Sequence, residues 1–285
     1  MLVKFAVIGG NASRDLAKRI ARRLKAPYVE AKTRVFPDGE SKITFGRTPK
    51  NSIILVVQST YPPVDTNLLQ ALSIISQARK VASKIYAIIP YMGYARQDRQ
   101  FLSGEVITMS IVAKMREAAG AKKIVVADIH SKIALNHFKI PKENVSAVPE
   151  LAKYFKKMKL KNALVVSPDM GGASRAKKFA ALLNTDFIAL KKSRNRKTGK
   201  VLIQSSKVDV RGRDLILVDD IISTGGSVIK ATQFLKRQKC KRVFVACTHG
   251  LFVEGAEKKI KKAGVSRIIS TNTIPRNTQK LTYLV

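Results

Sequence analysis

Short apolar segments alternate with amphipathic segments along the whole chain, and this pattern restricts the fold more than any other feature. The apolar segments are KFAVIG, IILVVQS, IYAIIPY, KIVVAD, ALVVSPD, DFIAL, LILVDD, RVFVACT and RIISTN. Strands that are apolar throughout are typical of parallel sheets, which helices such as the one expected at residues 13–26 cover on both faces. The sequence therefore predicts the α/β class.

The order of these segments repeats in the second half of the chain. FAVIGGNASRDLAKRIA near residue 5 resembles ALVVSPDMGGASRAKKFA near residue 163, and two further pairs of segments follow in the same order. We therefore predict two tandem duplicated domains, residues 1–148 and 149–285, each with a β-hairpin between two of its strands. The last ten residues or so, which include KLTYLV, are a candidate for a return to the N-terminal domain.

The charge balance is the one unusual feature of the composition. The 285 residues include 54 Lys and Arg against 19 Asp and Glu, a formal net charge of +35, while hydrophobic residues make up an ordinary 45%. Nucleic acid, anionic lipid and phosphorylated small molecules are all possible partners for such a chain. Solvated helix faces such as EKKIKKAG explain much of the charge equally well, so charge alone selects no partner.

Cysteine usage and hydropathy indicate where the protein works. Cys240 and Cys247 lack the spacing of a metal or redox motif, and we expect reduced thiols. No apolar run approaches the roughly 18 residues that span a bilayer, and two glycines interrupt the apolar start too early for a signal peptide. We expect a soluble, cytoplasmic protein.

The segment LILVDDIISTGGSVIKA, residues 215–231, joins an apolar strand to a loop that suits an anion. Glycines let backbone N–H groups approach a phosphate, hydroxyls add donors, and the helix that follows directs its positive N-terminus at the site. The loop consists of Ser223, Thr224, Gly225, Gly226 and Ser227. A Gly-Gly turn before a helix is equally often purely structural, and the spacing is not that of a Walker loop.

Asp219 and Asp220 lie two residues before this loop and change its interpretation. Carboxylates beside a phosphate repel it, so we expect them to face sugar hydroxyls or a metal ion instead. A phosphate next to a polyol is a sugar phosphate, and ribose 5-phosphate fits that description.

His130 and Asp169 follow strands in different halves of the chain and form a plausible metal pair. Imidazole and carboxylate, completed by water and substrate phosphates, suit Mg²⁺. The alternative for His130 is an ordinary hydrogen-bonding residue at a strand end. His137 and His249 are interpreted as structural.

The segment KKSRNRKTGK, residues 191–200, contains six Lys or Arg and no acid. Such a hairpin suits a flap that closes over a polyphosphate and stabilises the charge that develops in phosphoryl transfer. A solvated basic loop is the alternative.

Two loops of the first half combine aromatic, acidic and basic residues. In FPDGE, Phe36 suits stacking on a base, while Asp38 or Glu40 suits an exocyclic amine. In GYARQDR, Arg96 and Arg99 suit phosphates. For each loop alone, a simple hairpin tip or helix entry is as good an explanation.

Taken together, FPDGE, PYMGYARQDR, DIH, SPDMGG, KSR and VDDIISTGG occur in the order found in ribose-phosphate pyrophosphokinases, the PRPP synthetases, and the chain resembles that family over nearly its whole length. The resemblance implies two phosphoribosyltransferase-like domains, the first on the ATP side and the second on the ribose 5-phosphate side. It implies Mg²⁺-dependent transfer of the β,γ-diphosphoryl group of ATP to the 1-hydroxyl of ribose 5-phosphate, giving PRPP and AMP. The segment SKIALNHF looks like the archaeal type.

The resemblance also implies residue roles. By it, Lys192 and Arg194 are catalytic, and His130 and Asp169 serve the metal. The residues implied for ATP are Phe36, Asp38, Gly39, Glu40, Arg96, Gln97 and Arg99. Those implied for ribose 5-phosphate are Arg194, Asp219, Asp220 and the 223–227 loop, in which Ser223 stands where many members have an aspartate. The family implies a homo-oligomer, a dimer or larger, with the ATP site at a subunit interface.

Three alternatives belong to other functional classes. A non-catalytic PRPP-binding regulatory relative should lack the flap lysine or the metal residues, which are present here. A nucleic-acid-binding repressor should carry a helix-turn-helix domain, but the α/β pattern starts near residue 4, so nucleic acid is an unlikely partner. A phosphoribosyltransferase would need neither FPDGE nor a duplicated domain.

Overall fold

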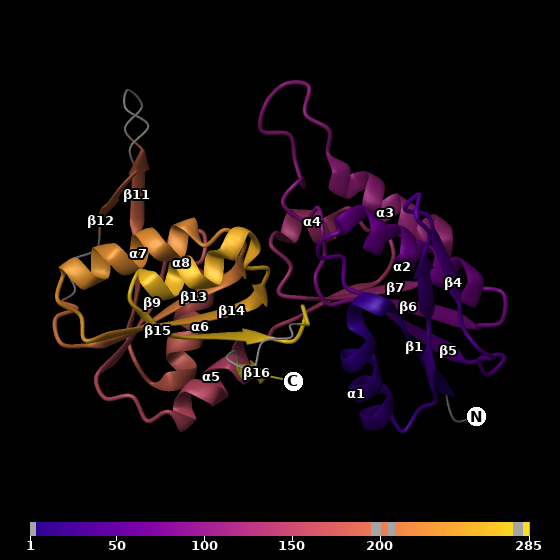
Figure 1. Ribbon diagram of the computed structural model, residues 1–285, viewed down its shortest axis with the longest axis horizontal. Coiled ribbons are helices and arrows are strands. Elements are labelled where there is room, and N and C mark those ends of the chain that lie inside the picture. Colours follow the sequence, from indigo (N-terminus) through magenta and orange to yellow (C-terminus); the bar gives the residue numbers. More distant parts are fainter. Residues whose placement is uncertain (1–3, 195–200, 205–208, 276–281, 285) are drawn as a thin grey trace. The chain divides into compact units, whose positions relative to one another are not determined.

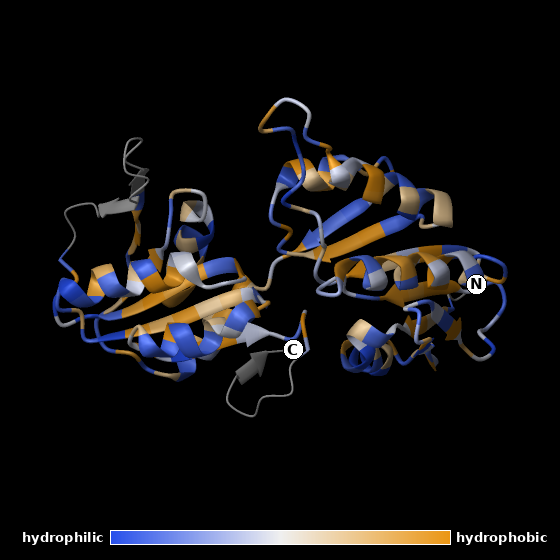
Figure 2. Ribbon diagram, turned by 45° about the horizontal axis from the view of Figure 1, so that its top comes forward, coloured by the Kyte–Doolittle hydropathy of each residue, from blue (hydrophilic) through white to orange (hydrophobic). Residues whose placement is uncertain are grey.

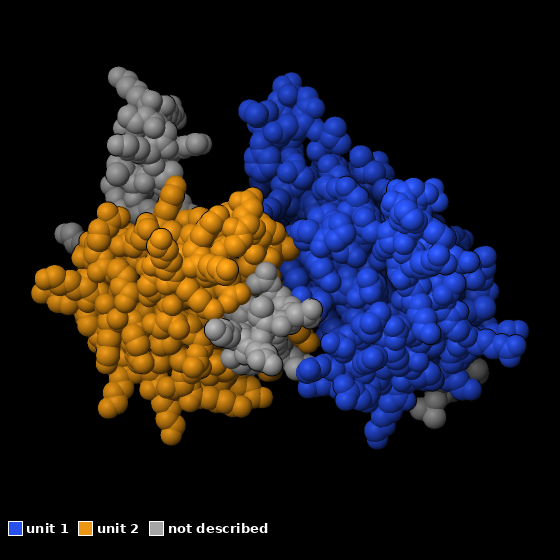
Figure 3. All heavy atoms as spheres, in the orientation of Figure 1, with its two compact units in different colours: residues 1–145, 273–275 blue, residues 146–272, 276–285 orange. Residues whose placement is uncertain are grey.

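The computed structural model describes residues 4–194, 201–204, 209–275 and 282–284 (Figure 1). The chain forms two compact units, which Figure 3 shows in different colours. The first unit contains residues 1–145 and 273–275, and the second contains residues 146–272 and 276–285. The division after residue 145 lies three residues before the expected boundary at 148.

The first unit is built on a six-stranded parallel sheet in the order β2-β1-β5-β6-β7-β8. Its strands are β1 (Phe5–Gly9), β2 (Tyr28–Glu30), β5 (Ile53–Val57), β6 (Lys84–Ile89), β7 (Lys123–Ala127) and β8 (Lys142–Val145). Its helices are η1 (Asn11–Ser13), α1 (Arg14–Leu24), α2 (Val64–Ala78), α3 (Thr108–Ala119) and α4 (Lys132–Asn136). The strands β3 (Lys32–Val35) and β4 (Ser41–Thr44) form a separate antiparallel hairpin.

The second unit repeats this plan, with a parallel sheet in the order β10-β9-β13-β14-β15-β16. Its strands are β9 (Ala163–Ser167), β10 (Phe187–Ala189), β13 (Asp214–Ile222), β14 (Arg242–Gly250), β15 (Val265–Thr271) and β16 (Thr282–Leu284). Its helices are α5 (Val148–Lys157), α6 (Ala173–Leu183), α7 (Gly226–Arg237), η2 (Val253–Gly255) and α8 (Ala256–Lys262). The hairpin of this unit joins β11 (Lys191–Arg194) to β12 (Val201–Gln204). The predicted α/β class and duplicated plan are confirmed.

The central strands are apolar throughout because both faces of each sheet are covered. In the first unit, Ala6 and Ile8 of β1 pack into one core, whereas Val7 between them packs into the core on the other face. In the second unit, Leu215 and Leu217 of β13 contribute to one core and Ile216 to the other. Figure 2 shows these central strands as hydrophobic and the outer faces of the helices as largely hydrophilic. Burial on both faces is what the continuous apolar runs predicted.

Three strands differ from the sequence-based expectation. Two of them, β2 and β8, are short edge strands that are partly or fully exposed, so no apolar run marks them. The third, β16, corrects the expected return of the C-terminus to the first domain: Thr282 pairs in parallel with Ile269 of β15. Residues 273–275 group with the first unit instead, where the Ser59 hydroxyl donates to the Thr273 carbonyl at 2.6 Å. In the described part of the chain, no helix has the length and apolarity needed to cross a bilayer.

Candidate active site

The carboxylates of the second unit lie within a strand. β13 runs through Asp219 and Asp220 to Ile222, and it stays paired with β14 past this point, where Ile221 opposes His249. The sequence indicates that the two acids end the strand, whereas the strand continues two residues past them to Ile222. The difference arises because the neighbouring strand is equally long, which keeps the ladder intact up to the loop.

Arg175 of α6 faces both of these acids. Its Nη1 atom lies 3.6 Å from Asp219 Oδ1 and 3.5 Å from Asp220 Oδ1. The side chains are 19% exposed for Arg175, 19% for Asp219 and 8% for Asp220. In addition, the backbone N–H of Asp220 donates to Asp219 Oδ1 at 2.9 Å. The three side chains form one charged cluster that is largely shielded from solvent, which we call the Arg175 cluster.

The electrostatics of the cluster favour an incoming positive or hydrogen-bond-donating group. Burial and, after it, the neighbouring carboxyl group of Asp220 raise the pKa of Asp219 to about 8, and Arg175 only partly opposes these effects. The carboxylate of Asp169 adds a smaller rise. Three acids therefore act on a site with one nearby guanidinium, and a ligand that donates to carboxylates would be stabilised there.

Asp169 lies in a tight loop between β9 and α6. The Ser167 hydroxyl donates to the Asp169 carbonyl at 2.6 Å, and the Gly172 N–H donates to Asp169 Oδ1 at 3.2 Å. A Cβ atom at Gly172 would lie only 2.5 Å from Ser167 Oγ, so the loop needs a glycine there. These contacts fix the position of the Asp169 carboxylate at the carboxyl end of the sheet.

The 223–227 loop leads directly into the N-terminus of α7. Gly225 has φ +78, and a Cβ atom there would lie 2.8 Å from Ile260 Cδ1. The first turn of α7 contains no acidic residue, and no side chain of the described part caps it. Thr224, Gly226 and Ser227 are exposed, whereas Ser223 is half-buried. The backbone N–H groups of a 12-residue helix thus point toward an accessible loop, which is the arrangement that binds phosphates.

His130 lies in the first unit, between β7 and α4. The backbone N–H of Ile129 donates to Asn144 Oδ1 at 2.9 Å, and the Ser131 hydroxyl caps α4 by accepting from the N–H of Ile133. His130 itself is exposed. Its predicted metal partner, Asp169, belongs to the second unit.

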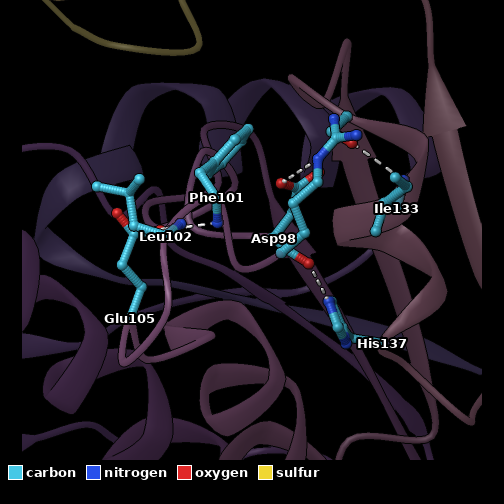
Figure 4. Close-up of polar contacts among 8 residues, drawn as sticks. Asp98, Phe101, Leu102, Glu105, Ile133 and His137 are labelled. Carbon is cyan, nitrogen blue, oxygen red and sulfur yellow. Dashed lines mark hydrogen bonds and ion pairs between the residues drawn. The ribbon is translucent and has the colours of Figure 1, made fainter.

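Hydrogen bonds of Asp98, Glu105 and His137 hold the loop that follows β6 (Figure 4). Arg96, Gln97 and Arg99 are exposed. Asp98 between them is 3% exposed, and its carbonyl accepts from His137 Nε2 at 2.7 Å. Further along, Glu105 Oε2 accepts from the N–H groups of Phe101 and Leu102 at 2.8 and 3.1 Å. Asp98, Glu105 and His137 therefore shape the loop, and His137 is structural as predicted.

The tip of the first hairpin has the predicted Asp-Gly turn. Gly39 adopts φ +93, the Phe36 N–H donates to the Glu40 carbonyl at 2.8 Å, and Asp38 Oδ1 accepts from the Glu40 N–H at 3.1 Å. Asp38 and Glu40 are exposed, while Phe36 is half-buried with the Arg34 guanidinium 5.1 Å from the centre of its ring. The tip is accessible to a ligand or to another subunit.

Lys192 and Arg194 lie in β11, opposite Ile203 and Val201 of β12. This confirms the second predicted hairpin. The side chains of Lys192 and Arg194, and the whole of 195–200, lie outside the described part of the chain.

Arg175 is the site residue that sequence reasoning missed. The signal was present, because the Ala-Ser-Arg repeated in the two halves includes Arg14 and Arg175. In the sequence alone, this repeat indicates only a duplication.

Comparison with known proteins gives the two halves separate matches. The family model of the N-terminal domain of ribose phosphate pyrophosphokinase matches residues 5–120. The phosphoribosyl transferase domain model matches residues 145–283. Together the two models cover most of the chain.

Curated relatives match over nearly the full length. The chain is 37% identical to the ribose-phosphate pyrophosphokinase of Sulfurisphaera tokodaii over 98% of this chain and 96% of that protein. It is also 37% identical to the enzyme of the same name from Pasteurella multocida, over 93% of this chain and 85% of that protein. The crystal structure of phosphoribosylpyrophosphate synthetase from Mycobacterium smegmatis superposes with a TM-score of 0.89 at 30% identity, covering 99% of this chain and 94% of that one.

Proposed function

The chain belongs to the ribose-phosphate pyrophosphokinase family, and we propose that it transfers the β,γ-diphosphoryl group of ATP to the 1-hydroxyl of ribose 5-phosphate, giving PRPP and AMP. Family membership makes it an enzyme, a transferase of nucleotide biosynthesis.

One observation carries the assignment of ribose 5-phosphate to the second unit. Asp219, the 223–227 loop and the N-terminus of α7 follow one another on a single strand-loop-helix segment. The helix N-terminus and the loop hydroxyls suit the 5-phosphate, and the carboxylate of Asp219 suits a ribose hydroxyl that donates to it. Asp220 is more buried than Asp219, so we assign Asp219 the main ribose contact and Ser223 a hydroxyl contact to the phosphate end.

We assign ATP to the first unit and to the hairpin tips. Arg96, Gln97 and Arg99 are exposed on the loop after β6 and suit the phosphates. Phe36, Asp38, Gly39 and Glu40 form an accessible turn that suits adenine, through stacking and through acceptance from its amine. Following the family, we propose that this turn serves the ATP site of a neighbouring subunit, so that the working enzyme is a dimer or larger.

The residues present fit Mg²⁺ as the cofactor. The Arg175 cluster and Asp169 set three carboxylates against one guanidinium, and the charges of Asp220 and Asp169 add to the rise that burial causes in the pKa of Asp219. Among the described residues, no group of three or more His, Cys, Asp or Glu forms a protein-only metal cage. Mg²⁺ typically takes one or two protein ligands and completes its shell with water and substrate phosphates. Following the family, we propose that Asp169 and His130 each serve Mg²⁺, an ion that would neutralise charge on the diphosphoryl oxygens.

Positioning and electrostatics account for the remaining chemistry. Asp219 orients the ribose, and the loop holds the 5-phosphate. We propose that Lys192 and Arg194 of β11 place their charges on the transferring phosphoryl groups, where cations stabilise the transition state. Cys240 and Cys247 are both buried, and we propose that the protein works in the cytoplasm.

A single assay tests the proposed function. The protein is incubated with ATP, Mg²⁺ and ribose 5-phosphate, and the products are separated by anion-exchange chromatography and identified by ³¹P NMR. We expect equal amounts of AMP and PRPP, and no AMP when ribose 5-phosphate is omitted. ADP in place of AMP would mean γ-phosphoryl transfer and would refute the proposal. Binding of PRPP without turnover would indicate a regulatory relative, and release of pyrophosphate on adding a nucleobase and PRPP would indicate a phosphoribosyltransferase.

A further inference from the structure

We propose that Arg175 is a positioning residue for ribose 5-phosphate: its guanidinium holds Asp219 and Asp220 in the orientation that accepts the ribose hydroxyls. This inference rests on the proposed function, since it names a residue that serves the sugar-binding carboxylates of the second unit. Arg175 contacts the sugar through these acids and is not assigned a contact with the reacting atoms.

In the Arg175 cluster, a single guanidinium nitrogen faces two carboxylates. One nitrogen, Nη1, lies 3.6 Å from Asp219 Oδ1 and 3.5 Å from Asp220 Oδ1, and so it bridges two adjacent carboxylates. Two carboxylates this close repel each other when both are ionised, and their low exposure weakens the screening by water. A cation between them offsets part of the repulsion and defines where their oxygens point. Without it, the pair would share a proton or turn apart.

The duplication shows that this bridge is a specific feature of the second unit. Arg14, the arginine of the first Ala-Ser-Arg, pairs with Glu30 of β2, with 3.0 Å between Nε and Oε1. Glu30 opposes Gly9 of β1, and the residue in the same place of the second unit, opposite Ser167 of β9, is Ala189. The second arginine thus lacks the edge-strand acid, and its partners are the two acids of β13.

The chemistry of the side chain explains why an arginine suits this place. A guanidinium has five N–H donors in a rigid plane, so it can serve two carboxylates and keep donors for other groups. A lysine supplies the same charge from one flexible ammonium, and it should restore only part of the alignment. The positive charge also opposes the repulsion between the two acids and the anionic substrate.

Steady-state kinetics of three variants test the role. We expect Arg175→Met to raise KM for ribose 5-phosphate about tenfold or more, with KM for ATP within about twofold and kcat changed much less than KM. Arg175→Lys should recover part of this loss. Arg14→Met removes the matching arginine of the first unit, which pairs with Glu30 at a half-exposed position, and should leave both KM values unchanged.

A fourth variant leaves Arg175 in place and tests its orientation. Ala189→Glu supplies the acid that Arg14 has in the first unit, and we expect it to draw the guanidinium away and raise KM for ribose 5-phosphate about threefold or more. This variant keeps the inference testable if Arg175→Met fails to fold. An unchanged KM in both the Lys and Glu variants, or in folded Arg175→Met, would overturn the inference.

Direct binding separates this inference from the proposed function. Titration calorimetry with ribose 5-phosphate, without ATP, should show binding to the wild-type protein and at least about tenfold weaker binding to Arg175→Met. If the wild type forms PRPP and Arg175→Met binds the sugar phosphate equally well, the inference is wrong and the function stands. If the wild type neither binds ribose 5-phosphate nor forms PRPP, the proposed function fails and the inference with it.

Discussion

The equivalent strands of the two sheets, β5 and β13, have side chains of different charge near their carboxyl ends. Ile53 opposes Phe5 at the start of β1, and Asp214 opposes Ala163 at the start of β9. Counting five residues onward from each, Gln58 occupies in the first unit the place that Asp219 occupies in the second. One fold therefore presents a neutral amide at one position and a carboxylate at its counterpart.

In the first unit, the side chain of Gln58 is buried and its hydrogen bonds are made within the protein. Its side chain is fully buried, its Oε1 accepts from the Ala12 N–H at 3.0 Å, and its Nε2 donates to Asn67 Oδ1 at 3.3 Å. A Cβ atom at Gly10 would lie only 2.1 Å from Gln58 Oε1, so the loop after β1 packs directly on this amide. Asp219 is instead 19% exposed and forms part of a charged cluster.

The helices that follow the two strands, α2 and α7, differ in how well their N-termini suit an anion. α2 is preceded by Pro62 and Pro63, which have no N–H to donate, and its first turn contains Asp65. α7 is preceded by Gly225, begins at Gly226, and has no acid in its first turn. An anion would be repelled at the first helix and stabilised at the second. The carboxylate, the glycine loop and the unblocked helix N-terminus thus occur together in the second unit, where we propose the sugar-phosphate site.

The largest effect should come from the hairpins, which carry different charges in the two units. We expect Lys192→Ala to lower kcat for AMP formation at least about 10²-fold, roughly 3 kcal/mol, because it removes a cation from the transition state. Binding of ribose 5-phosphate should be nearly unchanged. The matched control is Lys32→Ala, at the corresponding end of the first hairpin. Equal turnover in Lys192→Ala and the wild type, measured in a coupled assay, would remove the hairpin from the mechanism.

Placing an acid in the first unit tests whether its closed site tolerates charge. Gln58→Glu buries a carboxylate and loses the donor to Asn67, so we expect a loss of about 3 kcal/mol in the free energy of unfolding at pH 8. The loss should shrink at pH 5, where the buried acid can hold its proton. Gln77→Glu, on the exposed face of α2, is the control and should change little. A stable Gln58→Glu at pH 8 would mean that the first site is more open than its packing indicates.

The glycine of the phosphate loop tests the backbone side of the comparison. Gly225→Ala combines a left-handed φ with a Cβ atom 2.8 Å from Ile260, and we expect a loss of about 2 kcal/mol in urea unfolding. Gly212→Ala has φ +68 but no atom within 4 Å of the new Cβ, so the conformational cost alone remains, about 1 kcal/mol. Equal losses in the two variants would show that close packing on α8 contributes nothing.

The pattern that specifies the sheets is visible in the sequence, whereas the edges are not. Residues such as Val56 and Leu217 are buried by helices on their own face of the sheet, and the residues beside them are buried on the other face, so period and hydropathy suffice. β2 and β8 gain their position from backbone pairing at an edge, with half-buried or exposed side chains. β16 is set by pairing with β15, which no local property of KLTYLV encodes.

The candidate site also has residues that the sequence reveals and one that it hides. Asp219 and Gly225 stand out because acids and glycines are rare next to an apolar strand, so the sequence alone marks them as candidate site residues. Arg175 does not stand out among 54 basic residues. Its proposed role depends on β13 pairing with β9, and on Ala189 standing where the first unit has the acid Glu30. Both facts belong to the tertiary structure. Residues that act through other residues are therefore the part of a site that a single sequence hides.

The smallest effect concerns proton uptake at Asp219, and it has the opposite sign to Gln58→Glu. The pKa of Asp219 is raised to about 8 when folded, against about 3.9 in an unfolded chain, so folding takes up a proton between these values. Stability of the wild type should therefore fall as the pH rises through this window, in the absence of Mg²⁺ and substrate. Asp219→Asn cannot ionise, and we expect it to be more stable than the wild type by about 1 kcal/mol at pH 8, with the difference vanishing near pH 4. Urea unfolding across this pH range measures the difference in stability, and an Asp219→Asn protein less stable than the wild type at pH 8 would contradict the prediction.

The same substitution should weaken the binding of ribose 5-phosphate. The second unit keeps a carboxylate that lowers its stability where the first unit has a hydrogen-bonded amide, and we propose that this carboxylate serves the sugar.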